Sequence, residues 1–143
     1  MIKIIAGGKR HLDWVNLAIS EYQKRLQKPF NISWELLEEE KLRLFLAEWP
    51  FLGNQFVVVL DERGKNLSSS ELSEILVKQF VSAREVVVII GGAFGVDEIV
   101  HRRANLVWSF SRLVFPHQLA RVMLVEQIYR AQEIWHGGKY HHE

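Results

Sequence analysis

Directly before the last residue of the chain, Glu143, stand three side chains of the kinds that move protons, Tyr140, His141 and His142. Tyrosine and histidine are common general acids and bases, and histidine changes its protonation state near neutral pH. Gly137 and Gly138 come shortly before them and would let the end of the chain fold over a site. A chain terminus is also the part of a protein that is most often disordered. The tail is therefore a candidate for acid–base chemistry, and its residue types alone do not decide the matter.

Two loops earlier in the chain have the composition of a binding site. Gly91, Gly92 and Gly95 follow an apolar run at residues 86–90, where glycine lets the backbone turn sharply and approach a ligand. The loop at residues 111–116 is unusually apolar and would suit a flat heterocycle such as adenine. The glycine loop matches neither the dinucleotide pattern nor the P-loop pattern. Each loop also has a purely structural explanation. The first would be a tight turn that needs glycine for its geometry, and the second would be buried under a neighbouring element or subunit.

Strands and helices that alternate along the chain must position these loops. The apolar runs at residues 56–60 and 86–90 are typical of parallel strands covered on both faces. Further strands are expected at residues 2–6, 31–37 and 106–110, the half-exposed second one toward an edge of the sheet. Periodicity and capping patterns predict helices that start at Asp13, near Glu38, at the capping box Ser68–Glu71, at Asp97 and at His117, with a polar turn at 61–65. This order predicts an α/β fold with a mostly parallel sheet, helices on both faces and a single domain at residues 1–143.

Composition excludes several kinds of protein and site. The chain has no cysteine, which excludes disulfides, thiolate nucleophiles and cysteine–zinc sites, and its histidines lack a metal-ligand spacing. No apolar run reaches the roughly 18 residues of a membrane span, and the N-terminal run is too short for a secretory signal. We therefore expect a cytoplasmic protein without a metal or a membrane. Residues 101–143 carry six Lys/Arg against three Asp/Glu, an excess that would suit an anionic partner or reflect chance.

The last expected helix, at residues 117–136, is apolar over more than one face. Such breadth on a terminal helix indicates a partner surface in addition to a core face. Arg121 and Glu126 interrupt the apolar surface. Buried charges are usually paired or functional, whereas charges on a solvated side would need no explanation.

Several of these segments together resemble the RlmH family of ribosomal RNA methyltransferases, a small branch of the SPOUT group. The most specific are FPHQ at residues 115–118, EQIYRA at 126–131 and the closing Tyr140-His141. Weaker matches are LD at 60–61, GK at 64–65, LSS at 67–69, IGG at 90–92 with Gly95, SFS at 109–111 and RV at 121–122. The likeness covers nearly the whole chain and is densest after residue 56.

The resemblance implies properties that composition and periodicity do not. It implies a deep trefoil knot in the C-terminal part of the α/β fold, an obligate homodimer and S-adenosylmethionine as the methyl donor. General rules of chain connection speak against a knot, so this expectation rests on the resemblance alone. The implied reaction is methylation of N3 of pseudouridine 1915 in 23S ribosomal RNA, on assembled ribosomes.

The resemblance also implies the residues of the site. The cofactor-binding residues would lie at the ends of neighbouring strands and are Leu60, Gly91, Phe110, Ser111, Arg112, Leu113, Val114 and Phe115. The tail would reach the active site of the other protomer. There we expect His141 to act as base or proton relay and Tyr140 to stack on or position the target base. Arg121 and Arg130 would hold phosphate or stabilise the anionic base.

The chain departs from the family between Glu38 and Phe56, where it is shorter than usual. This difference leaves the cofactor loops intact and concerns N-terminal packing and ribosome docking. Two other functions stay open. The glycine loop would suit a different nucleotide-using α/β enzyme, and the shortened segment would suit a ribosome-binding factor that is not catalytic.

Overall fold

Parallel strands in the order β2–β1–β4–β3–β5 make up the sheet of the computed structural model, which describes residues 1–142. The strands are β1 Ile2–Gly7, β2 Ile32–Leu37, β3 Gln55–Asn66, β4 Glu85–Ile90 and β5 Leu106–Ser109. The helices are α1 Asp13–Gln23, α2 Glu39–Ala47, α3 Ser69–Val81, α4 Glu98–Arg103 and α5 His117–Trp135. The named strands pair in parallel, and β2 lies at an edge. The predicted α/β fold is confirmed.

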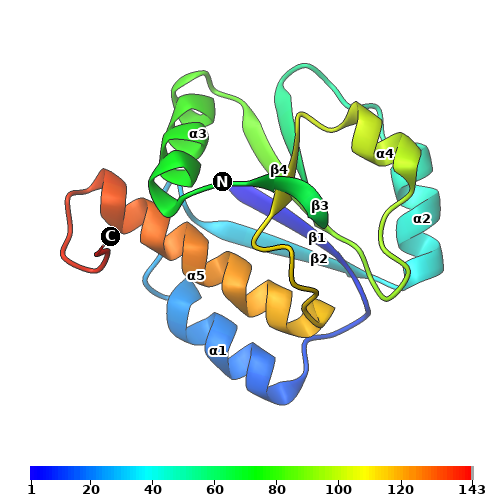
Figure 1. Cartoon of the computed structure of the whole chain (residues 1–143), viewed down its shortest axis with the longest axis horizontal. Helices are drawn as coiled ribbons and strands as arrows, with labels where there is room; N and C mark the ends of the chain where they lie inside the picture. The colour runs from blue at the N-terminus through cyan, green and yellow to red at the C-terminus, as the bar shows by residue number, and fades with distance from the viewer. Residues whose placement is uncertain (143) are drawn as a thin grey trace.

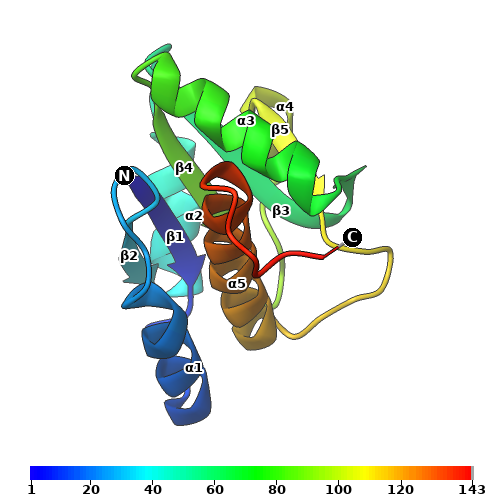
Figure 2. The same ribbon diagram turned by 90° about the vertical axis from the view of Figure 1, so that its left-hand side faces the viewer.

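Helices cover both faces of the sheet, with α1, α3 and α5 on one side and α2 and α4 on the other (Figures 1 and 2). The side chains of β4 alternate between the two cores. Val86 and Val88 pack in the core under α1, α3 and α5, whereas Val87 and Ile89 pack against α2 and α4. Because both faces of β4 are covered, the strand is apolar along its whole buried length.

Three predicted helix starts can be compared with the structure. The Ser68 hydroxyl accepts a hydrogen bond from the Glu71 N–H at 3.0 Å, and the Glu71 carboxylate accepts one from the Ser68 N–H at 3.0 Å. This capping box begins α3, as predicted. The predicted cap at Asp13 is wrong, because Leu12 occupies the N-cap position and Asp13 lies in the first turn of α1. Asp97 does stand at the N-cap of α4, but its side chain makes no capping bond.

β3 is longer than predicted. The expected strand ends at Leu60 and is followed by a polar turn, whereas the observed strand continues to Asn66. Its pairing with β5 shifts in register, since Leu60 and Lys65 both pair with Trp108. The pairing with β5 is therefore irregular over residues 61–64. The predicted turn is wrong because a polar, irregularly paired strand lacks the apolar pattern by which a buried strand is recognised.

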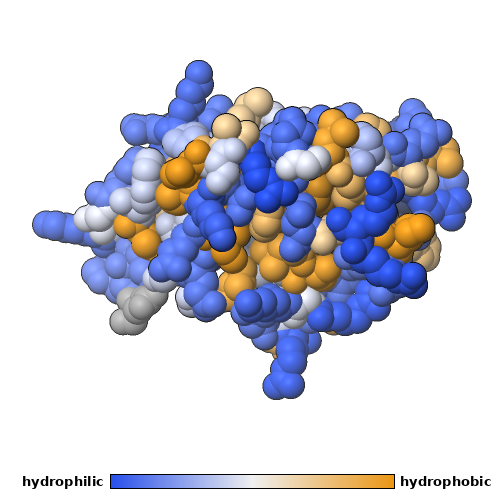
Figure 3. Space-filling model, turned by 90° about the horizontal axis from the view of Figure 1, so that it is seen from above, coloured by the Kyte–Doolittle hydropathy of each residue, from blue (hydrophilic) through white to orange (hydrophobic). Residues whose placement is uncertain are grey.

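The surface is mostly hydrophilic in the view from above, where hydrophobic residues lie in separate patches (Figure 3). Several large hydrophobic side chains are exposed on the surface of the molecule. They include Trp14 and Leu17 of α1, Phe94 of the glycine loop, and Leu113 and Val114. Among residues 1–142, none of the helices combines the length and the apolarity that crossing a lipid bilayer requires. The two exposed loop residues, Leu113 and Val114, belong to the segment that follows β5.

Candidate functional site

A pocket of about 140 Å³ lies at the carboxyl ends of β4 and β5 and beside residues 60–62 of β3, where the regular pairing of that strand stops. In open parallel sheets, ligands commonly bind outside the carboxyl ends of the strands. β3, the glycine loop, the β5–α5 segment and the start of α5 all contribute to the lining, which consists of Leu60, Asp61, Glu62, Ile90, Gly91, Gly92, Gly95, Trp108, Phe110, Ser111, Leu113, Phe115, His117 and Ala120. The structure thus brings both predicted loops to one pocket.

Most residues predicted to bind the cofactor line this pocket. They are Leu60, Gly91, Phe110, Ser111, Leu113 and Phe115. The other two, Arg112 and Val114, belong to the same loop but lie outside the lining, and Val114 is 78% exposed. That Arg112 and Val114 also contact the cofactor stays a prediction.

The lining also contains eight residues that were not predicted to bind the cofactor, namely Asp61, Glu62, Ile90, Gly92, Gly95, Trp108, His117 and Ala120. Asp61 and Glu62 directly follow Leu60. Their position after an apolar run marks them as candidates for the site, but the sequence analysis assigns them to a polar turn. His117 is the first residue of α5 and stands next to the predicted loop. Trp108 is buried within β5, and only the β3–β5 pairing brings it to the pocket.

The glycine loop folds back on itself at the pocket. The Gly95 N–H donates to the Gly92 carbonyl at 3.0 Å, and Gly95 has a φ of 73°. A Cβ atom on Gly91 would lie 2.7 Å from the carbonyl carbon of Gly95, so glycine is required there for the close approach. On its outer side, the loop is held by α2, because the Ala93 N–H donates to the Glu39 carboxylate.

The charged part of the lining is acidic. Hydrogen bonding from the Arg63 side chain lowers the pKa of Asp61 to about 2, despite its partial burial. Asp61 is therefore ionised at neutral pH, and the neighbouring Glu62 is exposed. Among residues 1–142, the lining contains no lysine or arginine, and no cluster of three or more acidic or histidine side chains could hold a metal ion. Such a pocket favours a neutral or cationic ligand over one that carries phosphates.

The tail lies against α5. The Tyr140 hydroxyl donates to Glu126 Oε1 at 3.1 Å, and its ring packs edge-to-face on Tyr129 with centroids 4.7 Å apart. The Arg130 guanidinium lies 4.7 Å from the Tyr140 ring centroid and donates to His141 Nδ1 at 3.1 Å. Arg130 also pairs with Glu126, with its Nε 2.9 Å from Oε1. The structure thus brings Tyr140 and His141 together around Arg130.

These contacts define the hydrogen-bonding roles of the two tail residues. Burial raises the pKa of Tyr140, and the nearby Tyr22 and Glu126 raise it further, so the hydroxyl stays protonated and acts as a donor. A guanidinium can only donate, so His141 accepts at Nδ1, and a neutral ring then carries its proton on Nε2. In this arrangement, Arg130 occupies the nitrogen lone pair that a general base would use.

Arg121 joins a different part of the molecule. Its side chain is completely buried, which excludes the solvated alternative, and burial lowers the pKa of the guanidinium. It donates to the Gly7 carbonyl at 2.9 Å and to the Arg10 carbonyl at 2.9 Å, and Nη1 lies 3.1 Å from His11 Nδ1. These bonds go to the loop between β1 and α1 and not to the tail. Arg121 therefore fixes that loop against α5.

Known proteins resemble this chain over nearly its full length. A family model described as "Predicted SPOUT methyltransferase" matches residues 1–141. Ribosomal RNA large subunit methyltransferase H from Caldicellulosiruptor bescii is 40% identical over 153 residues, covering 99% of each chain. Proteins of the same name from Thioalkalivibrio sulfidiphilus and Clostridium botulinum (strain Kyoto) are 36% and 37% identical, covering 99% and 98% of each chain.

The comparison with C. bescii also bears on the length of the chain. The alignment extends over 153 positions, whereas the chain has 143 residues, so the relative contains residues that this chain lacks. That the missing residues fall between Glu38 and Phe56 stays a prediction. Because the matches cover nearly the whole chain at this level of identity, the resemblance noted in the sequence is confirmed, and the chain belongs to the SPOUT methyltransferase family.

Proposed function

We propose that this protein uses S-adenosylmethionine to methylate N3 of pseudouridine 1915 in 23S ribosomal RNA, on assembled ribosomes and as a cytoplasmic homodimer. The shared name of its relatives supports ribosomal RNA as the substrate. The observation that carries the proposal is the pocket at the carboxyl ends of β4 and β5 and beside residues 60–62 of β3, because its position and lining suit a sulfonium nucleoside.

The lining fits the nucleoside part of S-adenosylmethionine. Leu60, Phe110 and Phe115 provide apolar walls, and Gly91 lets the backbone approach a flat ring. The volume of about 140 Å³ is below the roughly 300 Å³ of a small cofactor pocket, so the adenine would be enclosed and the rest would lie along the mouth. When bound, this cofactor supplies a methyl group on a positively charged sulfur.

The acidic lining separates this proposal from the nucleotide-using alternative. Arg63 already pairs with Asp61, so it is mainly the exposed Glu62 that would attract a sulfonium cation and repel the phosphates of ATP or a dinucleotide. In phosphate sites, a basic side chain or a ring of backbone N–H groups normally balances the negative charge. The lining of this pocket, as far as the structure describes it, has no lysine or arginine to do so.

The tail residues would handle the proton of the target base. The imide N3–H of pseudouridine must lose its proton, and His141 would accept it directly or relay it. For this, Arg130 must release His141 Nδ1, which a move of the tail to the neighbouring protomer would accomplish. Tyr140, kept protonated, would position the base as a donor or by stacking. Arg121 would add positive potential near the start of α5, where Gly8 lies beside both Arg121 and His117.

Transfer of labelled methyl groups to ribosomes tests the proposal. Ribosomes from a strain without this modification, incubated with the protein and S-adenosylmethionine, should gain one methyl group per 23S RNA at pseudouridine 1915. Mass spectrometry of the nucleosides and primer extension would identify the base. Ribosomes that already carry the modification are the control. Ribosome binding without transfer would instead favour the non-catalytic factor, and calorimetric binding of ATP or NAD but not S-adenosylmethionine would favour the nucleotide-using enzyme.

A further inference from the structure

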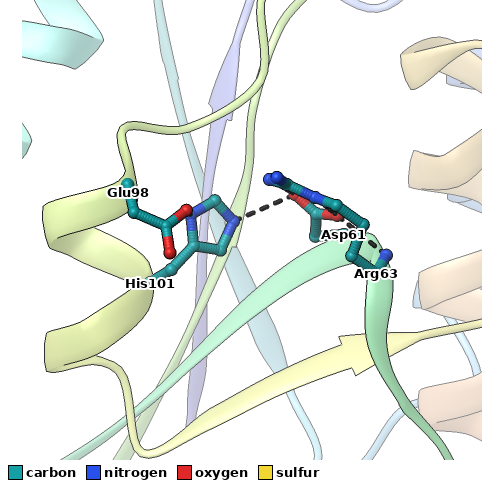
Figure 4. A network of polar contacts seen from close by, with 4 residues as sticks. All are labelled: Asp61, Arg63, Glu98 and His101. Carbon is teal, nitrogen blue, oxygen red and sulfur yellow. Dashed lines mark hydrogen bonds and ion pairs between the residues drawn. The ribbon is translucent and has the colours of Figure 1, made fainter.

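His101 of α4 points toward Asp61 of β3 (Figure 4). His101 Nε2 lies 3.0 Å from Asp61 Oδ2, and the two side chains are only 8% and 11% exposed. A hydrogen bond to an ionised carboxylate is stronger than one between neutral groups, and burial strengthens it further. The two residues are 40 positions apart, so the bond ties α4 to the middle of β3, where the regular pairing of that strand stops.

The Asp61 carboxylate is held from its other side by Arg63. The Arg63 N–H and Nε donate to Oδ1 at 2.9 and 3.0 Å, and Nη2 donates to Oδ2 at 2.9 Å. Together with His101, these donors satisfy both carboxylate oxygens. Asp61 is therefore a fixed anchor in the pocket wall, and His101 is attached to it.

α4 is a short helix with modest anchorage of its own. It has six residues, lacks a side-chain N-cap bond and buries Val100. Arg103 at its end donates to the Pro50 carbonyl at 3.4 Å and lies 4.1 Å from the Phe51 ring centroid, toward the α2 side. The His101–Asp61 bond links the helix to the part of β3 that lines the pocket. A short helix has little stability of its own without tertiary contacts, so we expect this hydrogen bond to help fix the position of α4.

The glycine loop directly precedes α4, so the position of α4 contributes to the position of the loop, together with the hydrogen bond from Ala93 to Glu39 of α2. Asp61 and the loop lie on different walls of the same pocket, and His101 joins these walls from outside the lining. We propose that His101 is a positioning residue, which holds residues 91–97 at the spacing from β3 that the cofactor requires. The cofactor part of this inference rests on the function proposed above.

Substitutions at His101 separate positioning from general stability. His101→Leu removes the donor at similar size, whereas His101→Gln keeps an amide N–H that can reach Asp61. His101→Asn is polar but too short to reach, and it replaces the leucine variant if that one fails to fold. Arg102→Gln, at an exposed position of the same helix, is the matched control. Hydrogen–deuterium exchange at residues 91–97 would be measured without cofactor. Calorimetry with S-adenosylmethionine and the KM and kcat of methyl transfer would follow.

In His101→Leu, amides at residues 91–97 should exchange faster than in the wild type. Its Kd and KM for S-adenosylmethionine should rise about fivefold to tenfold with kcat within about twofold, the loss expected for one strong hydrogen bond. In His101→Gln and Arg102→Gln, the Kd and KM for S-adenosylmethionine should stay within about twofold of the wild-type values. Unchanged exchange in His101→Leu would overturn the inference, as would faster exchange with unchanged affinity. A wild-type protein that binds no S-adenosylmethionine would refute the proposed function and the cofactor role together, while the exchange rates still decide whether His101 holds the loop.

Discussion

His141 and the residues of the pocket should have separable effects on activity. His141 lies against α5 with Arg130, outside the pocket lining. Replacing it by alanine should therefore lower the rate of methyl transfer by about 100-fold or more, as for loss of a general base. The Kd for S-adenosylmethionine should stay within about twofold of the wild-type value. The rate of methyl transfer is measured on ribosomes, and the Kd is measured by calorimetry on the free protein. An unchanged rate would remove the proposed role of His141.

Asp61 should make stability depend on pH in the acid range. Its pKa is about 2 in the folded protein, against 3.8 for the free side chain, chiefly because Arg63 hydrogen-bonds to it. The folded state therefore binds fewer protons, so the carboxylate stabilises the protein above about pH 4, and this contribution of about 2 kcal/mol disappears as the pH falls toward 2. The difference in unfolding free energy between wild type and Asp61→Asn, from urea titrations, should shrink over that interval. A difference that is constant with pH would contradict this.

Pocket residues could be predicted to different extents from the sequence. Leu60 and Gly91 stand at the ends of apolar runs, where the apolar pattern alone places a strand end, whereas Phe115 lies in the apolar loop at residues 111–116; the family resemblance names all three. His101 could not be predicted, because its partner Asp61 is 40 positions away and only the folded chain brings them together. Arg121 was recognised as important, but its hydrogen bonds to backbone carbonyls at Gly7 and Arg10 carry no sequence signal.

Among the secondary-structure elements, those with a complete local signal were predicted best. β4 is an unbroken apolar run and α3 has a capping box, so both were predicted near their observed bounds. The outer half of β3 was missed because its pairing with β5 requires neither apolar nor β-branched residues. The outer half of β3 is held by the close approach of its backbone to that of β5, and this approach depends on Gly64.

Gly64→Ala tests the importance of this approach. A Cβ atom at residue 64 would lie 2.6 Å from the carbonyl carbon and oxygen of Val107, so β3 and β5 would have to separate. We expect a loss of about 1–3 kcal/mol in unfolding free energy and weaker cofactor binding, since Trp108 of β5 lines the pocket. Gly53→Ala is the matched control, because nothing lies within 4 Å of its Cβ position. Equal stability of the two variants in urea titrations would contradict a close β3–β5 contact.

At the scale of the whole molecule, only part of the surface of α5 is buried in the core. Leu124 and Ile128 are buried against the sheet, while Val122 and Met123 line a separate cavity of about 410 Å³ beside the tail. A second copy of the chain would cover this surface in the proposed homodimer. The trefoil knot implied by the family likewise concerns the path of the entire chain. It stays a prediction, because no local pattern encodes a knot.

Light scattering tests the homodimer. The wild-type protein should have about twice the 16.7 kDa mass of one chain. Met123→Glu should give monomers and abolish methyl transfer, because it places a charge in the interface and separates each tail from its partner's pocket. Leu44→Glu, at an exposed position of α2 in the opposite layer, should leave both mass and activity unchanged. A wild-type monomer that transfers methyl groups at full rate would exclude a tail shared between protomers.

A crystal structure with bound S-adenosylmethionine tests the strand-end pocket most directly. We predict the adenine among Leu60, Gly91 and Phe115, with backbone hydrogen bonds from the β5–α5 loop and the methyl group toward the tail of the neighbouring protomer. Electron density for the cofactor at any other place, or an empty pocket in crystals grown with saturating S-adenosylmethionine, would contradict the proposed site.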